Sequence, residues 1–289
     1  MIWLTIILVP ALFLCVCVGL SFFISHRQIQ KAFISPVAFG LVYEDIQLRT
    51  SDSIRLSGWW IPAGSSNRTI IFLHGYGGTY DPDLQYVPAF HNKGFNALMF
   101  DFRAHGRSGG HYTTVGALER QDCLAAIDFA LSRGSTAIGL MGFSMGGRVA
   151  ILSAPERPQV KAVLSDGGPA RLTTVVSVEL MKKGLPHWLA NVLAFMVELG
   201  MSIVSGINLF KQEPIRQAAG LLKIPVLFIH GDHDPYTRLD ELESMVLASG
   251  PNTECWRIPE AGHRDSDQYR PEEYIQKVTA FFERWLLER

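Results

Sequence analysis

Short apolar runs, each closing on glycine or a polar turn, alternate with helix-like segments along most of this chain. The runs are rich in β-branched and aromatic residues, which is typical of buried strands. Buried strands that alternate with helices predict an α/β fold, with a mostly parallel central sheet and helices on both faces. The predicted strands occupy residues 69–78, 95–103, 136–144, 160–168, 224–232 and 253–263, and the predicted helices occupy residues 116–134, 144–154 and 271–289.

Two parts of the chain depart from this alternation. Residues 42–50 and 54–63 flank a short polar turn and predict an antiparallel pair of strands. The interval 169–223 is too long for a simple crossover and contains very apolar helix-like segments. One of them, residues 186–206, has the composition of a second membrane span, but such a span would separate two strands of one sheet, and Glu198 would be costly in lipid. We therefore predict a helical cap over the carboxyl edge of the sheet.

The first 25 residues contain no charged side chain. A helix of this length spans a hydrocarbon core of roughly 30 Å, and membrane helices tolerate a residue such as Pro10. The alternative is a cleaved signal peptide, but no basic residue precedes the apolar run and no clear small-x-small site follows it. We expect an uncleaved transmembrane anchor. Because Arg27 and Lys31 follow it, the positive-inside rule predicts that the remaining chain lies on the cytoplasmic side.

The charge balance and the cysteines exclude several classes of function. The chain has 26 Lys and Arg residues against 27 Asp and Glu residues, so it lacks the basic excess of a nucleic-acid-binding protein. Its four cysteines form no CxxC pair, and its histidines show no HExxH spacing. We therefore expect no nucleic-acid partner, no metal site and no disulfide framework.

Chemically active side chains stand where the predicted parallel strands end. Ser144 lies between glycines after one strand, Asp234 follows another, and His263 follows the last. A glycine-rich loop begins with Tyr76 after the first parallel strand. Because the carboxyl ends of parallel strands meet at one edge of a sheet, we expect a nucleophile, an acid, a base and an anion-binding loop to face one site.

In this order and context the residues resemble the alpha/beta hydrolase superfamily, on its serine-hydrolase, esterase-like and lipase-like branch. The likeness covers roughly residues 42–289. The motifs that carry it are Gly142-Phe143-Ser144-Met145-Gly146, His74-Gly75-Tyr76-Gly77-Gly78, residues 101–108, Asp234 and Gly262-His263. We expect a transmembrane anchor over residues 1–25, a linker over 26–41, and a hydrolase domain over 42–289 with a cap insertion over 169–223.

The resemblance implies a role for each residue of the site. Ser144 would be the nucleophile, His263 its general base and Asp234 the carboxylate that orients the histidine. The backbone N–H groups of Tyr76 and Met145 would form the oxyanion hole. The glycines on either side of Ser144 would relieve crowding at a sharp turn between strand and helix.

The identity of the acid has alternatives. Family spacing favours Asp234, three residues after the glycine that ends its strand. Asp166 is a candidate because some relatives place the acid one strand earlier, and Asp232 is a weaker candidate that we expect to cap its turn. We expect His74 to support the oxyanion loop, and Asp101, Arg103 and His105 to be structural.

A serine-histidine-aspartate site transfers acyl groups to water. The anchor and the apolar cap favour a membrane-anchored hydrolase of carboxylic esters, acting on a small acyl-ester or lipid-like substrate. The alternatives are an acyl thioesterase, then a serine peptidase, then a non-catalytic membrane scaffold. No cofactor is expected, because such a site needs only water.

Overall fold

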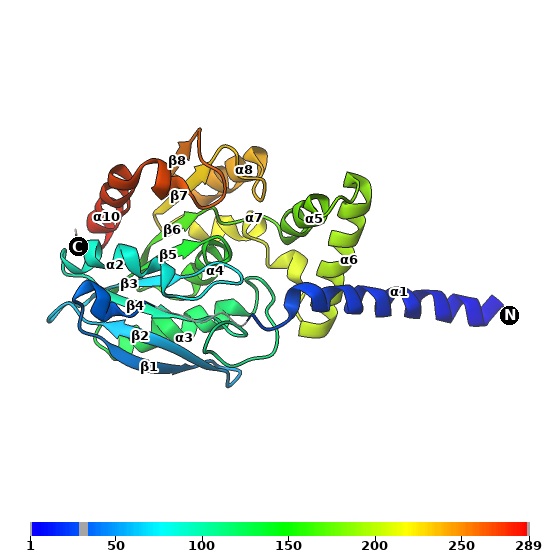
Figure 1. The fold of residues 1–289 in the computed structure, drawn as a ribbon, viewed down its shortest axis with the longest axis horizontal. Helices are drawn as coiled ribbons and strands as arrows, with labels where there is room; N and C mark the ends of the chain where they lie inside the picture. The colour runs from blue at the N-terminus through cyan, green and yellow to red at the C-terminus, as the bar shows by residue number, and fades with distance from the viewer. Residues whose placement is uncertain (1, 29–33, 288–289) are drawn as a thin grey trace.

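The computed structural model describes residues 2–28 and 34–287. Its centre is one eight-stranded sheet in the order β1-β2-β4-β3-β5-β6-β7-β8 (Figure 1). The strands are β1 (Glu44–Arg49), β2 (Arg55–Ile61), β3 (Arg68–Leu73), β4 (Asn96–Phe100), β5 (Ala137–Phe143), β6 (Val160–Asp166), β7 (Val226–Gly231) and β8 (Thr253–Ile258). Every strand predicted from the sequence is present.

The sheet is antiparallel at one edge and parallel elsewhere. β1 pairs with β2 in antiparallel register, as the turn at residues 51–53 predicts, and β2 also pairs with β4 in antiparallel register. The pairs from β4 through β8 are parallel. The chain leaves β3 toward β4 on one side, and β5 then pairs with β3 on the other side. This reversal opens the carboxyl ends of β3 and β5, which is where ligands bind in open α/β sheets.

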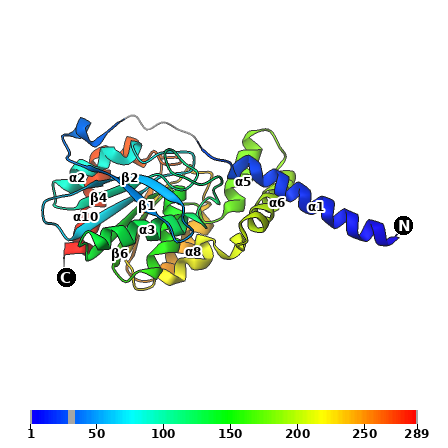
Figure 2. The same cartoon turned by 90° about the horizontal axis from the view of Figure 1, so that it is seen from below.

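Helices cover both faces of the sheet (Figures 1 and 2). The adjacent residues Trp59 and Trp60 of β2 show the division, because each is buried in a different hydrophobic cluster. The cluster around Trp60 includes side chains of α3, α4 and α8, and the cluster around Trp59 includes side chains of α2 and α10. These helices are α2 (Val87–His91), α3 (Glu119–Ser132), α4 (Met145–Ser153), α8 (Leu239–Ser249) and α10 (Pro271–Leu287), with the short α9 (Ser266–Tyr269) before α10. Of these, α2, α8 and α9 were not predicted.

The long insertion between β6 and β7 is helical, as predicted. It contains α5 (Leu172–Lys182), α6 (His187–Ser205) and the short α7 (Pro214–Gln217). α5 meets the segment after β7, where its Glu179 accepts a hydrogen bond from the Tyr236 hydroxyl. The insertion therefore lies beside the carboxyl ends of the strands, as a cap would.

The chain begins with α1 (Ile2–Ser25), which projects from the body of the molecule (Figure 1). Within the described residues, one helix is long and apolar enough to cross a membrane, and it is α6, a third of which is buried inside the protein. In α1 the apolar stretch found among the described side chains is the shorter segment Pro10–Phe22. Met1 and the side chains of residues 2–7, Val9 and Phe23 lie outside the description. The membrane span over residues 1–25 therefore stays a prediction.

The predicted linker over residues 26–41 is partly ordered onto the domain. The Gln28 backbone N–H donates to the Ala104 carbonyl at 2.7 Å, and the Gly106 N–H donates to the Gln28 carbonyl. The Arg27 guanidinium donates to the Ser108 carbonyl at 2.7 Å. Residues 27 and 28 are thus hydrogen-bonded to the loop after β4. Residues 29–33, including Lys31 of the predicted orientation signal, lie outside the described residues.

Candidate active site

Ser144 stands on a sharp turn between β5 and α4. Its backbone adopts φ +51° and ψ −115°, a conformation that costs a non-glycine residue energy. Gly142 and Gly146 allow the turn, because a Cβ on Gly142 would overlap the carbonyl oxygen of Gly146, and one on Gly146 would overlap that of Leu73. The turn holds the serine at the carboxyl end of β5, at the start of a helix.

The structure brings Ser144, His263 and Asp234 into one hydrogen-bonded chain. His263 Nε2 lies 2.9 Å from Ser144 Oγ, and His263 Nδ1 lies 2.8 Å from Asp234 Oδ2. The Asp234 side chain is fully buried, whereas that of His263 is 22% exposed. With its proton on Nδ1, the imidazole donates to the carboxylate and accepts from the serine hydroxyl. This is the arrangement in which histidine acts as a base toward serine.

The other candidate acids have different partners. Asp166 accepts hydrogen bonds from Arg264 Nη1 at 2.7 Å and from the Tyr274 hydroxyl at 2.6 Å. Asp232 forms an ion pair with Arg257 at 2.7 Å, rather than capping its turn through its side chain. Among the three aspartates, Asp234 is the one that contacts His263.

The two residues expected to supply the oxyanion hole lie next to Ser144 or next to a residue in contact with it, because Met145 follows Ser144 and Tyr76 follows Gly75. β3 and β5 end in register, with Leu73 beside Gly142, so the loop after β3 lies against the serine. A Cβ on Gly75 of that loop would lie 3.5 Å from Ser144 Cβ. Met145 is the first residue of α4, a position whose N–H has no acceptor within the helix. In the part of the chain that the structure describes, neither the Tyr76 nor the Met145 N–H donates a hydrogen bond.

Buried polar residues beneath this loop hold its shape. The Phe102 N–H donates to His74 Nε2 at 2.9 Å, and His74 Nδ1 lies 2.7 Å from the Gly75 carbonyl. Burial and the neighbouring His105 lower the pKa of His74 to about 3, so the ring is neutral. The Arg103 guanidinium lies 2.7 Å from the buried carboxylate of Asp122. The His74 contacts link the loops after β3 and β4, and the Arg103 contact ties the second of these loops to α3, so both residues have the structural role expected of them.

Tyr236 is a residue of the site that the sequence analysis missed. Its ring meets the His263 ring edge to face with centroids 4.6 Å apart, and its N–H donates to Asp234 Oδ1 at 2.8 Å. The signal was the spacing, because an aspartate commonly accepts the N–H of the residue two positions later. Its hydroxyl contacts Glu179 and Lys182 of the cap helix α5, so Tyr236 connects the cap to the candidate acid and base.

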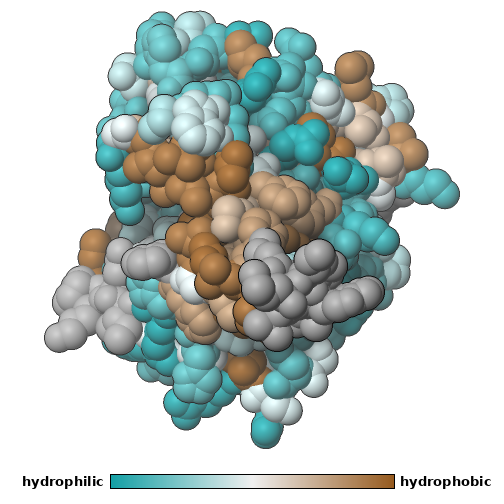
Figure 3. Space-filling model, turned by 90° about the vertical axis from the view of Figure 1, so that its right-hand side faces the viewer, coloured by the Kyte–Doolittle hydropathy of each residue, from teal (hydrophilic) through white to brown (hydrophobic). Residues whose placement is uncertain are grey.

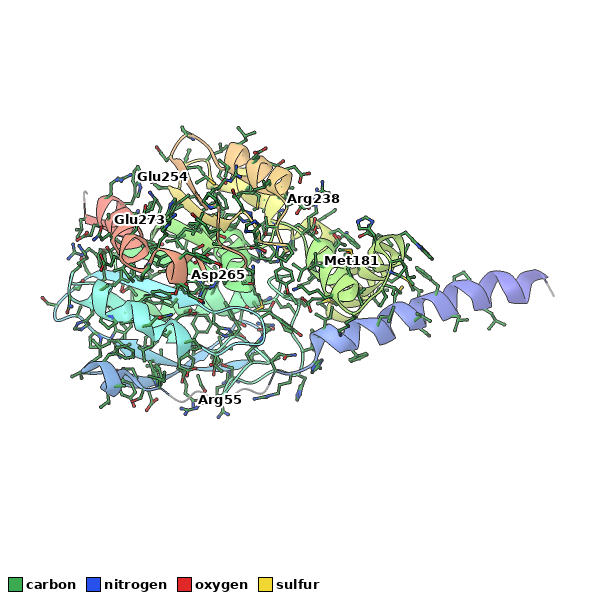
Figure 4. The ribbon with its side chains drawn as sticks, turned by 45° about the horizontal axis from the view of Figure 1, so that its top comes forward. Arg55, Met181, Arg238, Glu254, Asp265 and Glu273 are labelled. Atoms are coloured by element: carbon green, nitrogen blue, oxygen red, sulfur yellow. The ribbon has the colours of Figure 1, made fainter. Side chains whose placement is uncertain are left out.

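Arg264 is a second missed residue, and it fixes the loop that carries His263. Its guanidinium lies 3.9 Å from the centre of the Phe143 ring and donates to Asp166. The backbone has φ +63° at Arg264, so the ion pair holds a strained position. The Gly262 N–H donates to the carboxylate of Asp265, the residue labelled beside this loop in Figure 4, at 2.7 Å. No motif in the sequence indicates the Arg264 contact, because Asp166 lies 98 residues away.

The described residues contain no group of three or more His, Cys, Asp or Glu side chains that could hold a metal ion. Both ring nitrogens of His263 are instead within hydrogen-bond distance of another side chain, Ser144 on one side and Asp234 on the other, which suits proton transfer.

A sequence model of the alpha/beta hydrolase family matches residues 70–277, which is well over half of the chain. The chain belongs to the alpha/beta hydrolase family. The matched range includes the loop after β3, Ser144, Asp234 and His263. The predicted fold, a mostly parallel sheet between helices, is confirmed.

Individual proteins resemble most of the chain. The esterase Pf2001 from Pyrococcus furiosus is 31% identical, with a TM-score of 0.73 over 90% of this chain and 99% of that protein. The alpha/beta hydrolase domain-containing protein WAV2 from Arabidopsis thaliana is 26% identical over 89% of this chain and 83% of its own length. The protein bem46 from Schizosaccharomyces pombe is 25% identical over 80% of this chain and 74% of its own length. The fold and the esterase similarity support a hydrolase.

Proposed function

We propose that this protein is a membrane-anchored serine hydrolase that cleaves carboxylic acyl esters. The observation that carries the proposal is the chain of contacts from Ser144 through His263 to Asp234, at 2.9 and 2.8 Å. A serine hydroxyl is a weak nucleophile near neutral pH, and a hydrogen-bonded histidine is the group that activates it. The similarity to an esterase over nearly its whole length adds support.

In the proposed mechanism, Ser144 Oγ attacks the ester carbonyl while its proton passes to His263 Nε2. Asp234 keeps the imidazole in the tautomer that accepts this proton and stabilises the imidazolium. Collapse of the tetrahedral intermediate breaks the bond to the alcohol oxygen, which takes the proton from His263 as it leaves. Water then attacks the acyl-enzyme and gives its proton to His263, and the carboxylic acid is released as the Ser144 hydroxyl is restored.

The N–H groups of Tyr76 and Met145 would stabilise the negative oxygen of each tetrahedral intermediate. In support, Met145 follows Ser144 and is the first residue of α4, whose N-terminus favours negative charge, and Tyr76 follows Gly75, which lies against Ser144. Loss of one such donor typically costs about 2.7–4 kcal/mol of transition-state stabilisation.

The proposed attachment to a membrane rests on α1. Its described side chains from Pro10 to Val16 are all exposed to solvent, although they are apolar. A 24-residue helix is about 36 Å long, which exceeds a hydrocarbon core of about 30 Å. We propose residues 1–25 as a single-pass anchor and place the hydrolase domain on the cytoplasmic side, because Arg27 and Lys31 follow the span.

Hydrolysis of a panel of acyl esters by the full chain in detergent tests the proposal. The panel pairs short acyl chains with medium ones and each ester with its thioester. We expect ester turnover that falls to the uncatalysed rate in Ser144→Ala. Folded protein that shows no Ser144-dependent turnover of any ester would refute an esterase, and faster turnover of the thioesters would reassign the substrate class.

A further inference from the structure

The outer face of the cap helix α6 is an apolar surface that the protein leaves uncovered. Trp188 is 68% exposed, Val192 51%, Phe195 49% and Ile203 47%. Their spacing of four, three and eight residues puts them on one side of an α-helix. Side chains this exposed neither line an acyl pocket nor pack in the core. Such exposed apolar faces mark binding surfaces.

This face belongs to a helix that packs tightly on α1. A Cβ on Gly200 of α6 would overlap the carbonyl oxygen of Cys17 in α1, so the two backbones are in direct contact. On α1, the small residues Cys17, Ser21 and Ser25 are buried at a spacing of four. Small residues that let two helix backbones approach are typical of helix pairs in membranes. The position of α1 therefore fixes the position of α6.

The packing places α6 near one end of α1 and across it. Figure 1 shows α6 running across α1 rather than along it. From Cys17 to the end of α1 at Ser25 is eight residues, about 12 Å at 1.5 Å per residue. If α1 spans a bilayer, α6 lies along the plane of one leaflet, close to the depth of about 5–10 Å at which interfacial helices bury their apolar faces.

The charges around α6 fit a helix in the plane of a membrane. Lys183 precedes the helix and Lys211 follows it, and both are exposed. A helix that crosses a membrane has its two ends in different headgroup layers, whereas an in-plane helix presents both ends to the same layer. Trp188, in the first turn of α6, is the residue type enriched at the boundary between headgroups and acyl chains. Glu198 does not oppose this placement, because its side chain is fully buried inside the protein and does not belong to the exposed face.

We infer that the outer face of α6 docks into the lipid leaflet that α1 enters, and that the site takes its acyl substrate from that leaflet. Figure 3 looks at this end of the molecule and shows apolar side chains gathered across it. From α6 the cap continues through α5, which carries Met181 in Figure 4, to Tyr236 and His263. The inference rests on the proposed function, because it takes α1 as a membrane anchor.

Fluorescence quenching in vesicles tests the docking without any measurement of activity. The full chain, with the exposed Cys15 and Cys255 replaced by serine, is reconstituted in phosphatidylcholine with phosphatidylglycerol. An environment-sensitive dye is attached at Phe195→Cys, at Leu12→Cys in α1, or at Leu247→Cys in α8, which is 82% exposed. A lipid nitroxide high on the acyl chain should quench position 195 at least as strongly as position 12, which lies deeper in the bilayer. Iodide in the buffer should quench position 247 alone.

Each other result overturns the inference in a recognisable way. Lipid quenching at position 12 without quenching at 195 would leave α1 in the membrane and α6 in water. No lipid quenching at either position would remove the anchor as well, and the proposed ester chemistry would then stand on the Ser144 experiments alone. Protection of position 195 that grows with protein concentration in the absence of lipid would mean that a second copy of the chain covers this face.

A charge on the face tests the delivery of substrate. Phe195→Glu should lower turnover of an ester held in vesicles several-fold relative to a water-soluble ester, whereas Leu247→Glu should leave the ratio unchanged. An unchanged ratio in Phe195→Glu would refute delivery from the leaflet.

Discussion

The Tyr76 hydroxyl donates a 2.8 Å hydrogen bond to the carbonyl of Ile24 in the last turn of α1. The same hydroxyl accepts a hydrogen bond from Gln28 Nε2 at 3.1 Å. Tyr76 also supplies one of the two backbone N–H groups proposed for the oxyanion hole. The end of the proposed membrane anchor is therefore hydrogen-bonded directly to the loop beside Ser144.

Removing this hydroxyl should weaken the site without removing the N–H. In Tyr76→Phe, two hydrogen bonds are lost, and a typical net contribution is about 0.5–1.5 kcal/mol each. We expect kcat for a water-soluble ester to fall between about twofold and tenfold, because the loop is held less firmly. Tyr269→Phe, at an exposed tyrosine of α9, is the matched control. Equal kcat values in both variants would show that the contact to α1 does not position the loop.

Replacing the carboxylate that contacts His263 should affect turnover far more. Asp234→Asn removes the charge that holds the Nδ1 proton, and we expect kcat to fall by about three to four orders of magnitude. Far-UV circular dichroism should remain unchanged. Asp232→Asn, which breaks only the ion pair to Arg257, should keep kcat within about threefold of wild type, since exposed pairs contribute little. Normal turnover in Asp234→Asn would instead make another group the partner of His263.

The strands and the turn at Ser144 could be predicted because their signals are local. Gly142, Ser144 and Gly146 lie within one turn, so the motif can be read from the sequence. The steric reason for Gly146 can be seen only in the fold, because the carbonyl that its Cβ would overlap belongs to Leu73, the register partner of Gly142. Asp234 could also be predicted as the acid, because it follows Gly231, the glycine that ends its strand, by three residues.

Contacts between distant segments could not be predicted from the sequence. Gly200 meets Cys17, which is 183 residues away in the chain, and nothing in either segment specifies the other. The contacts of Gln28, within the predicted linker over residues 26–41, could not be predicted for the same reason, since its partners lie on the loop after β4. The short helix α2 was not predicted, because it is only five residues long and contains Pro88.

The close approach of α1 and α6 gives a prediction about stability. Gly200→Ala forces the helices apart and should destabilise the folded protein by about 1–3 kcal/mol, the usual cost of overpacking. Gly19→Ala, whose added Cβ would meet nothing within 4 Å, is the matched control in α1. Thermal unfolding of the full chain in detergent compares the two. A melting temperature of Gly200→Ala equal to that of Gly19→Ala would contradict the packing.

The buried His74 should make stability depend on pH. The pKa of its imidazole is about 3 in the folded protein and about 6.5 when unfolded, so between these values the unfolded state binds more protons. Stability from this group is therefore present above pH 6.5 and decreases as the pH falls, by up to about 1.4 kcal/mol per pH unit. The stability difference between wild type and His74→Gln should shrink from pH 7 to pH 5. A difference that stays constant would mean that His74 does not titrate in this way.

The most direct test of the account is whether Ser144 is an activated nucleophile. The full chain in detergent is incubated with a fluorophosphonate probe, and its intact mass is compared with that of Ser144→Ala. We predict a single adduct in wild type that maps to Ser144 and is absent from the variant. Folded wild-type protein that forms no adduct, or an adduct that persists in Ser144→Ala, would contradict the proposed serine hydrolase.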